Sequence, residues 1–206
     1  MTTRTYPARV ALSAPYEVDR WRPFVHWLLD IPHLAITWAL GRLRQVLIVI
    51  ALVTVVCTTR IPRPLFDAMV MTYRYEWRAM AYLLAMHQSY PPFDFTSSSV
   101  DDGADPHTRL SVDYPEELER WAPLYKWFLA IPHYLVLVWR WIEAAFVFVW
   151  AAFAVLVYAK YPERARDFLV AVYRYGIHVQ AYVLLLTDDY PSFRLPAQPT
   201  DQEVRS

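Results

Sequence analysis

The chain has 206 residues, of which 56% are hydrophobic, and its 20 basic and 20 acidic side chains leave no formal net charge. A neutral chain with thinly spread Lys and Arg gives no electrostatic reason to expect a nucleic-acid partner. A single cysteine, Cys57, excludes an intrachain disulfide. The apolar residues form long runs, which is typical of membrane helices and unusual in soluble domains.

The sequence repeats itself at a spacing of 100 residues. Of the 90 pairs that this shift aligns from residue 11 to residue 100, 25 are identical, where unrelated chains would give roughly six. Ile-Pro-His occurs at 31–33 and 131–133, and Tyr-Arg-Tyr occurs at 73–75 and 173–175. Chance similarity between apolar stretches does not align Trp, Pro and His, so we predict two tandem copies of one unit.

Each copy begins with a short stretch of alternating character, at 9–12 and 109–113, which we predict to form a strand outside the membrane. A proline then stands at the first turn of a predicted helix, over 15–30 in one copy and 115–130 in the other. Its apolar residues recur every three or four positions with basic residues elsewhere, which favours a helix lying in the membrane interface. An amphipathic helix packed on protein is the alternative.

Two apolar segments follow in each copy. We predict membrane spans at about 33–59 and 65–87 in the first copy, and at about 133–159 and 165–187 in the second. Charged residues that we expect to mark the interfacial end of the first span are Arg42, Arg44, Arg140 and Glu143. Two spans per copy imply that both copies enter the membrane in the same direction, related by a pseudo-two-fold axis along the membrane normal.

The predicted fold is therefore an all-α integral membrane protein with four transmembrane helices in two parallel repeats. Its parts are repeat 1 at 1–95, a linker at 96–107, repeat 2 at 108–195 and a polar tail at 196–206. The linker is rich in Ser and Asp, so we expect it to be flexible. Basic residues near the span ends favour cytoplasmic termini.

Ionisable residues interrupt the second span of each copy. Spacings of seven and four place them on one helical face, with Asp67, Arg74 and Arg78 in the first copy and Asp167, Arg174 and His178 in the second. A charge at the bilayer centre costs at least about 2.5–3.5 kcal/mol, so these residues are expected to face protein or a wet cavity.

Three interpretations of these arginine faces stay open. The first is neutralisation within the fold, for which the candidate carboxylates besides the two aspartates are Glu17, Glu76, Glu117 and Glu143. The second is a basic pocket for an anionic lipid head group, because guanidinium matches phosphate geometry. The third is a polar pathway for ions or small solutes.

One motif recurs near the predicted interface, at Trp27, Pro32 and His33 and again at Trp127, Pro132 and His133. We interpret it as structural, because proline breaks or kinks a helix and a histidine there caps the kink or faces head groups. Paired histidines on membrane helices can ligate haem, but one histidine per copy lacks partner spacing. We therefore predict no metal and no cofactor, with haem as a weak alternative.

Several segments carry a family resemblance. They are Tyr-Pro-Glu-Glu-Leu at 114–118, Trp-Phe-Leu-Ala-Ile-Pro-His-Tyr at 127–134, Lys-Tyr-Pro-Glu at 160–163 and the run at 182–193. With them the chain resembles, over nearly its whole length, a bacterial and mainly actinobacterial membrane family catalogued as domain of unknown function 4389. The resemblance implies a membrane location and the repeat, and it brings no activity or catalytic residues. The first copy departs from the pattern at 42–44, 60–64 and 76–78, which suggests specialised contacts there.

No nucleophile–base arrangement stands out, so we expect a non-enzymatic protein. The leading hypothesis is an accessory or scaffold subunit of a larger complex in a bacterial plasma membrane, because nine tryptophans and 15 tyrosines favour interface anchoring and protein contacts. Expected partners are membrane lipids and other membrane subunits or a second copy of the chain, and no nucleic acid. The alternative is a lipid-binding or transport-associated protein that uses the arginine faces. A haem or quinone redox subunit is a weaker alternative.

Overall fold

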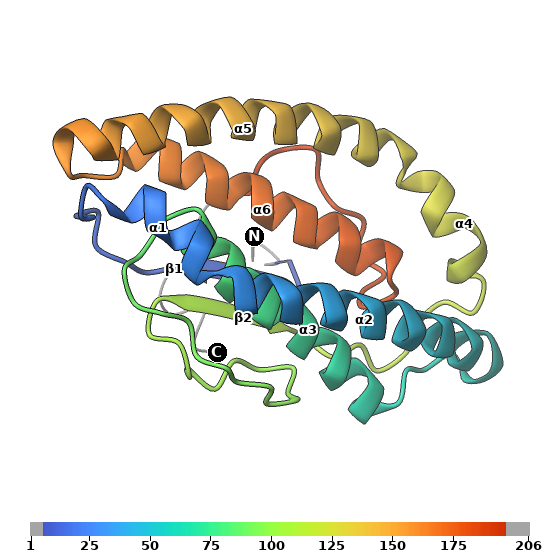
Figure 1. Ribbon diagram of the computed structural model, residues 1–206. Helices are drawn as coiled ribbons and strands as arrows, with labels where there is room; N and C mark the ends of the chain where they lie inside the picture. The colour runs from blue at the N-terminus through green and yellow to red at the C-terminus, as the bar shows by residue number, and fades with distance from the viewer. Residues whose placement is uncertain (1–5, 197–206) are drawn as a thin grey trace, which may run out of the picture.

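The two copies fold with the same order of elements. The computed structural model describes residues 6–196 and contains, within them, six helices and two strands (Figure 1). The first copy consists of β1 at Ala8–Leu12, α1 at Arg22–Leu29, α2 at Ile31–Thr58 and α3 at Arg63–Leu83. The second consists of β2 at Thr108–Val112, α4 at Ala122–Leu129, α5 at Ile131–Tyr158 and α6 at Glu163–Val183. The predicted repeat and the two predicted short strands are confirmed.

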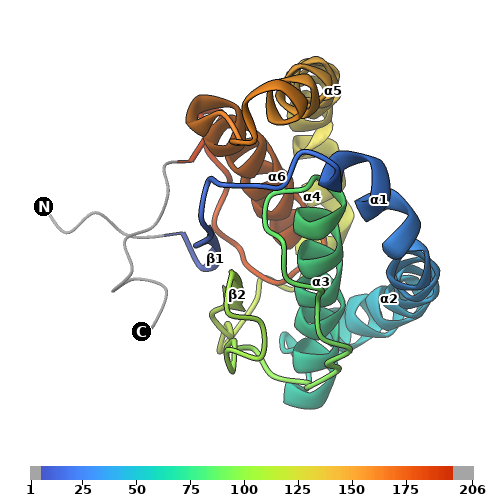
Figure 2. The same ribbon diagram turned by 60° about the vertical axis from the view of Figure 1, so that its left-hand side comes forward.

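The elements lie in three layers (Figure 2). The two strands form one side, α3 and α6 form the middle, and α2 and α5 form the opposite side. The short helix α1 contacts α5, and α4 contacts α2. The strands pack crosswise, because β1 of the first copy contacts α6 of the second and β2 contacts α3. Buried and half-buried residues alternate along β1, as expected for a strand with one covered face. The two copies are thus interlocked through their strands.

The pairing of the strands places a pseudo-two-fold axis through the molecule. β1 and β2 are antiparallel, and Val10 pairs with Leu110, its own equivalent in the other copy. The pairs on either side are symmetric about this one, from Ala8 with Val112 to Leu12 with Thr108. The axis therefore passes between Val10 and Leu110, perpendicular to the strands.

The long helices α2 and α5 run in opposite directions, as the colour along them in Figure 1 shows. The N–H of Val18 donates to the carbonyl of Ala159 at 3.2 Å, and the N–H of Leu118 donates to that of Thr59 at 2.8 Å. Each copy thus begins beside the end of the other copy's long helix. The predicted parallel arrangement of the two repeats is wrong for the long helices, because the antiparallel pairing of β1 with β2 sets α2 and α5 in opposite directions.

Matching signals set the ends of α2 and α5. Each helix has proline in its first turn, where the missing N–H costs no intrahelical bond. Each ends at a non-glycine residue in the left-handed region, Thr59 with φ 59° and Ala159 with φ 54°. The short helices before them begin at Arg22 and Ala122, with proline again in the first turn, and cover eight residues each. The predicted helices at 15–30 and 115–130 are therefore too long, because Pro15 and Pro115 do not start them.

Two of the four predicted spans are long and apolar enough to cross a bilayer. They are α2 and α5, and only 11% and 22% of their most apolar windows are buried. Helices α3 and α6 do not reach that apolarity, because each carries charged residues along its length, and most of their side chains are buried. The prediction of four spans is therefore corrected to two candidate spans.

The central core joins α3, α6 and β1. The indole of Trp77 is fully buried, donates to the carbonyl of Ala11 at 3.2 Å and stacks on Tyr173 with ring centroids 4.6 Å apart. Buried aromatic side chains contribute strongly to core stability, and the hydrogen bond satisfies the indole N–H. This contact fixes the middle layer relative to the strand layer, which positions the arginine faces.

Candidate functional site

The predicted arginine faces of α3 and α6 point toward the strands and the segment between the two copies. Arg74 and Arg174 are each 2% exposed, Arg78 is 1% exposed and His178 is 7% exposed. All four belong to the middle-layer helices, and each is hydrogen-bonded to a strand or to the segment that follows α3. Their partners are therefore protein groups.

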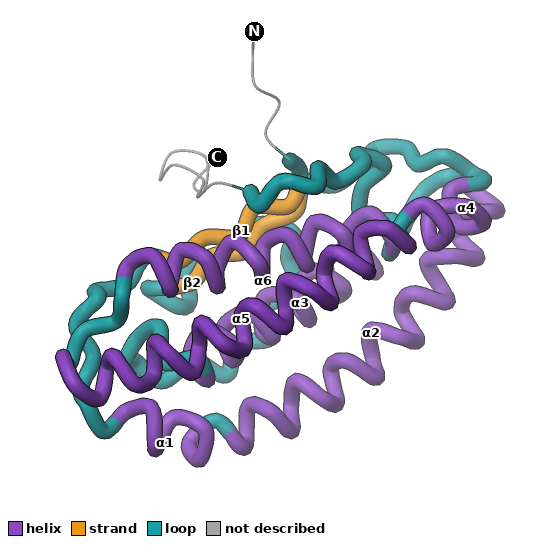
Figure 3. Tube along the Cα trace, turned by 90° about the horizontal axis from the view of Figure 1, so that it is seen from above, coloured by secondary structure: helices purple, strands orange, loops and turns teal. Residues whose placement is uncertain are grey.

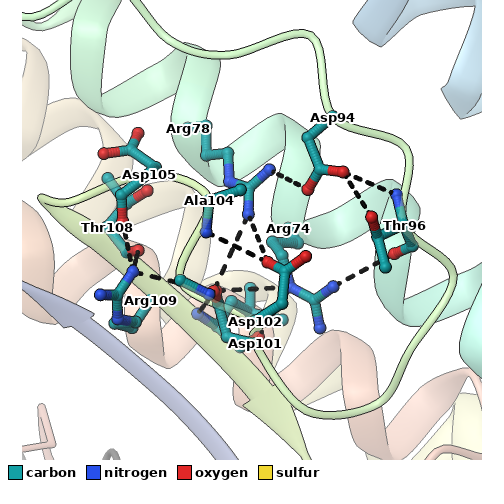
Figure 4. Close-up of polar contacts among 12 residues, drawn as sticks. Arg74, Arg78, Asp94, Thr96, Asp101, Asp102, Ala104, Asp105, Thr108 and Arg109 are labelled. Carbon is teal, nitrogen blue, oxygen red and sulfur yellow. Dashed lines mark hydrogen bonds and ion pairs between the residues drawn. The ribbon is translucent and has the colours of Figure 1, made fainter.

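Arg74 ties β2 and the linker to α3 (Figure 4). Its Nε donates to the carbonyl of Leu110 at 3.1 Å, and its Nη atoms donate to the carbonyls of Thr96 and Ser98 at 3.3 and 2.8 Å. The carboxylate of Asp101 lies 3.4 Å from the same Nε. A buried guanidinium is stable only when its donors and its charge are both satisfied, and these contacts supply both.

Arg78 lies one turn later and pairs with three carboxylates. Asp94 is 2.8 Å from its Nη1, and Asp101 and Asp102 are each 3.8 Å from its Nη2. Burial opposes the ionisation of Asp94, but hydrogen bonds from Arg78 and Thr96 outweigh burial and lower its pKa to about 2. Asp94 is therefore charged at neutral pH and neutralises Arg78 inside the fold.

Asp101 is the centre of this cluster. Its side chain is 2% exposed and accepts the backbone N–H groups of Leu110 and Gly103, both at 2.9 Å. Gly103 has φ +83°, and a Cβ there would lie 3.3 Å from the guanidinium of Arg109, so this turn requires glycine. The linker, expected from its composition to be flexible, instead packs against α3 and supplies the carboxylates for its arginines.

Arg174 makes the reciprocal contact on α6. Its Nε donates to the carbonyl of Val10 at 2.8 Å, as Arg74 donates to that of the equivalent Leu110, and its Nη1 donates to the carbonyl of Pro196 at 3.1 Å. Burial lowers the pKa of Arg174 to about 10, and the charge of Asp167 opposes that shift. Each arginine therefore clamps the strand contributed by the other copy.

Four of the carboxylates named from the sequence pair with other basic residues. Asp67 lies 3.4 Å from Arg63 on its own helix and not with Arg74. Ion pairs also join Glu76 to Arg44, Glu117 to Arg60 and Glu143 to Arg140. The true partners of α3 are Asp94, Asp101 and Asp102, which the prediction missed. Three aspartates within residues 101–105 were a signal for them, since buried arginines need nearby carboxylates.

His178 occupies the position equivalent to Arg78 and is hydrogen-bonded to β1. Its Nε2 donates to the carbonyl of Ala8 at 3.0 Å, and its ring stacks on Tyr6 with centroids 4.0 Å apart. The hydroxyl of Tyr6 donates back to the carbonyl of His178 at 3.0 Å. The neutral imidazole is thus built into the contact between α6 and β1.

His178 predicts a loss of stability in mild acid. Burial lowers its pKa from 6.5 to about 4, so as the pH falls the unfolded chain takes up the proton first. Its contribution is complete above pH 6.5 and falls by up to about 3 kcal/mol between pH 6.5 and 4. His178→Gln keeps a donor for Ala8 and should lose less stability between pH 7 and 4.5 in thermal unfolding. Equal losses in both proteins would contradict this assignment.

The Ile-Pro-His motif begins α2 and α5. His33 is hydrogen-bonded through Nδ1 to the hydroxyl of Tyr75 at 2.8 Å and stacks on Phe93, with centroids 4.4 Å apart. His133 repeats this with Tyr175 at 2.7 Å and with Phe193. Trp27 and Trp127 lie on α1 and α4, both more than half exposed. The motif joins the start of each long helix to the loop that follows the middle-layer helix of the same copy.

Two of the three departures of the first copy from the family pattern, at 42–44 and 76–78, meet in space. Arg44 on α2 pairs with Glu76 on α3 at 2.7 Å, and its guanidinium lies 4.0 Å from the ring centroid of Tyr73. The equivalent residues of the second copy are Ala144 and Gly176, both small and uncharged. One copy therefore joins its two helices with a charged pair where the other uses close apolar packing.

These contacts fit the first interpretation, in which the arginines are neutralised within the fold. They bind the strand layer to the middle layer and hold the two copies together. Within residues 6–196 there is no group of three or more His, Cys, Asp or Glu side chains that could hold a metal ion.

Comparison with known proteins identifies the repeated unit. Neither the curated proteins nor the solved structures give a match to this chain. A family described as Domain of unknown function (DUF4389) matches it twice, at residues 20–94 and 120–194. The matches span the three helices of each copy and leave out both strands and Asp101. The chain therefore belongs to the DUF4389 family and carries two tandem copies of its domain.

Proposed function

We propose that this chain is a non-enzymatic scaffold subunit of a membrane assembly. The observation that carries the proposal is the exposed apolar surface of α2 and α5, which rests on two well-packed layers. In this role, the apolar helices contact lipid and partner subunits, and the strand side gives the assembly a fixed platform. A bacterial plasma membrane is the location that the family resemblance favours.

The size of the apolar surface supports a membrane role. Monomeric soluble proteins seldom expose contiguous apolar patches beyond a few hundred Å². Here large side chains are exposed along the whole of α5, for example Leu135 at 70%, Phe146 at 74% and Phe153 at 64%. Burying one such side chain contributes about 1.5–3 kcal/mol, so covering this surface with lipid or with a partner's helices stabilises the protein strongly.

The arginine contacts favour scaffolding over the alternative of a lipid or solute site on the arginine faces. Arg74 and Arg78 bind main-chain carbonyls and aspartates, and Arg174 binds the carbonyls of Val10 and Pro196. These residues therefore hold the strand platform in place. A strand layer held in this way is a rigid surface, which favours a role in protein contacts over a role in transport.

Native mass spectrometry of the full-length protein, extracted gently from its own membrane, tests the proposal. We expect a complex that contains either other subunits or a second copy of the chain. A lone chain with stoichiometric lipid would overturn the scaffold role. The same preparation gives an optical spectrum, in which a Soret band would support the haem alternative instead.

A further inference from the structure

One side of the molecule carries most of the exposed large apolar side chains. They lie on α1, α2, α4 and α5, and in the described part of the chain none of them belongs to α3 or α6. The strands lie on the opposite side, as Figures 2 and 3 both show. The two outer layers of the protein therefore differ. One consists of helices with exposed apolar side chains, and the other consists of the strands.

The segments beside α2 and α5 cannot follow them through a bilayer. Because α3 packs on α2, α6 packs on α5 and the strands pack on α3 and α6, a crossing would carry all of these elements to the same depth (Figure 3). The segment 84–121, which contains the linker and β2, would cross too, since it runs from the end of α3 to the start of α4 at the other end of the molecule. Irregular backbone exposed to lipid leaves polar groups unsatisfied at a cost of several kcal/mol each.

Charged residues lie in the middle of both long helices. Arg42 is exposed in α2, and the ion pair of Arg140 with Glu143 is one-third exposed in α5. The expectation that such residues mark the end of a span is wrong, because α2 and α5 are continuous from Ile31 and Ile131. At the bilayer centre each charge would cost at least about 2.5–3.5 kcal/mol, whereas at an interface long side chains reach water.

We infer that α2 and α5 lie flat in one leaflet of a phospholipid bilayer, with the pseudo-two-fold axis along the membrane normal and the strand layer in water. This inference rests on the part of the proposed function that places the protein at a membrane. It does not depend on the presence of a partner subunit. Helices of 28 residues are about 42 Å long, well beyond the hydrocarbon thickness of about 30 Å. Exposed tryptophans along this side, such as Trp38 at 66% and Trp139 at 62%, suit the head-group region.

Four single-cysteine variants test this orientation. In a Cys57→Ser background, the variants are Arg20→Cys, Arg60→Cys, Arg120→Cys and Lys160→Cys. All four positions are exposed, and they form two pairs related by the 100-residue repeat. The full chain in sealed membrane vesicles is treated with a membrane-impermeant maleimide before and after detergent is added. We expect all four cysteines to react from the same side of the membrane.

The two crossing arrangements give different patterns, and either pattern overturns the inference. If each copy crossed twice in the same direction, 20 and 120 would react from one side and 60 and 160 from the other. If α2 and α5 each crossed once, 20 and 160 would oppose 60 and 120. Either result leaves the scaffold proposal standing, because a transmembrane scaffold remains. A protein recovered as a soluble dimer would overturn both.

Discussion

Asp101→Ala lowers the free energy of unfolding by about 3–5 kcal/mol, the range for removing one partner of a buried ion pair. The aspartate is 2% exposed and faces the guanidinium groups of Arg74 at 3.4 Å and Arg78 at 3.8 Å. Its loss leaves Arg74 without a carboxylate and frees the backbone N–H groups of Leu110 and Gly103. Denaturant unfolding of the purified protein in a fixed detergent measures the change.

Two matched variants separate the ion pair from other effects of the substitution. Leu110 and Gly103 donate to different oxygens of Asp101, so Asp101→Asn keeps an acceptor for one of these two N–H groups and removes the charge. We therefore expect it to fall between Asp101→Ala and the parent. Glu117→Ala removes the exposed partner of Arg60 and should leave the unfolding midpoint unchanged, because solvent screens that pair. If Asp101→Ala behaved like Glu117→Ala, the linker would not be part of the folded core.

Val149→Asp weakens binding to phospholipid vesicles on the order of 30-fold, which corresponds to the loss of about 2 kcal/mol of apolar burial. Val149 is 67% exposed on α5, on the side that we place in the leaflet. Its replacement removes an apolar contact and adds a carboxylate to the lipid side. Phe146→Asp, at 74% exposure, should weaken binding further. Flotation of the protein with vesicles of fixed composition measures the partition.

Val100→Asp is the matched control for this experiment. Val100 is 55% exposed, but it lies in the linker beside the strand layer, which we place in water. The same chemical change there should leave flotation as it was. Equal losses from Val149→Asp and Val100→Asp would show that added negative charge alone reduces binding, and that the side of the molecule does not matter.

The sequence predicts local features of this fold well. The strand at Ala8–Leu12 and the breaks between the short and long helices at Pro32 and Pro132 follow from residues a few positions apart. The repeat spacing of 100 residues comes directly from aligned motifs, and the two family matches have the same spacing. Each of these signals lies within one element or between aligned positions, so no tertiary contact is needed to see it.

The errors concern contacts between distant segments. The predicted span at 65–87 contains Tyr73 and Trp77, so it is apolar enough to suggest lipid, yet these side chains pack on α6 and the strands. The direction of the second copy depends on pairing Val10 with Leu110, which no local pattern encodes. The partner of Arg74 was also missed, because Asp101 lies in a loop whose composition suggested flexibility.

The exchange of strands has a consequence for how such a chain arises. A shorter chain with a single unit would hold a strand that fits the helix of a neighbour, so two identical subunits would be needed to complete the fold. The pairing of Val10 with its own equivalent, Leu110, is self-complementary, which is the requirement of an isologous dimer interface. When the two units are joined in one chain, their sequences no longer have to be identical. Arg44 and Glu76 can then accumulate in one half while Ala144 and Gly176 occupy the other.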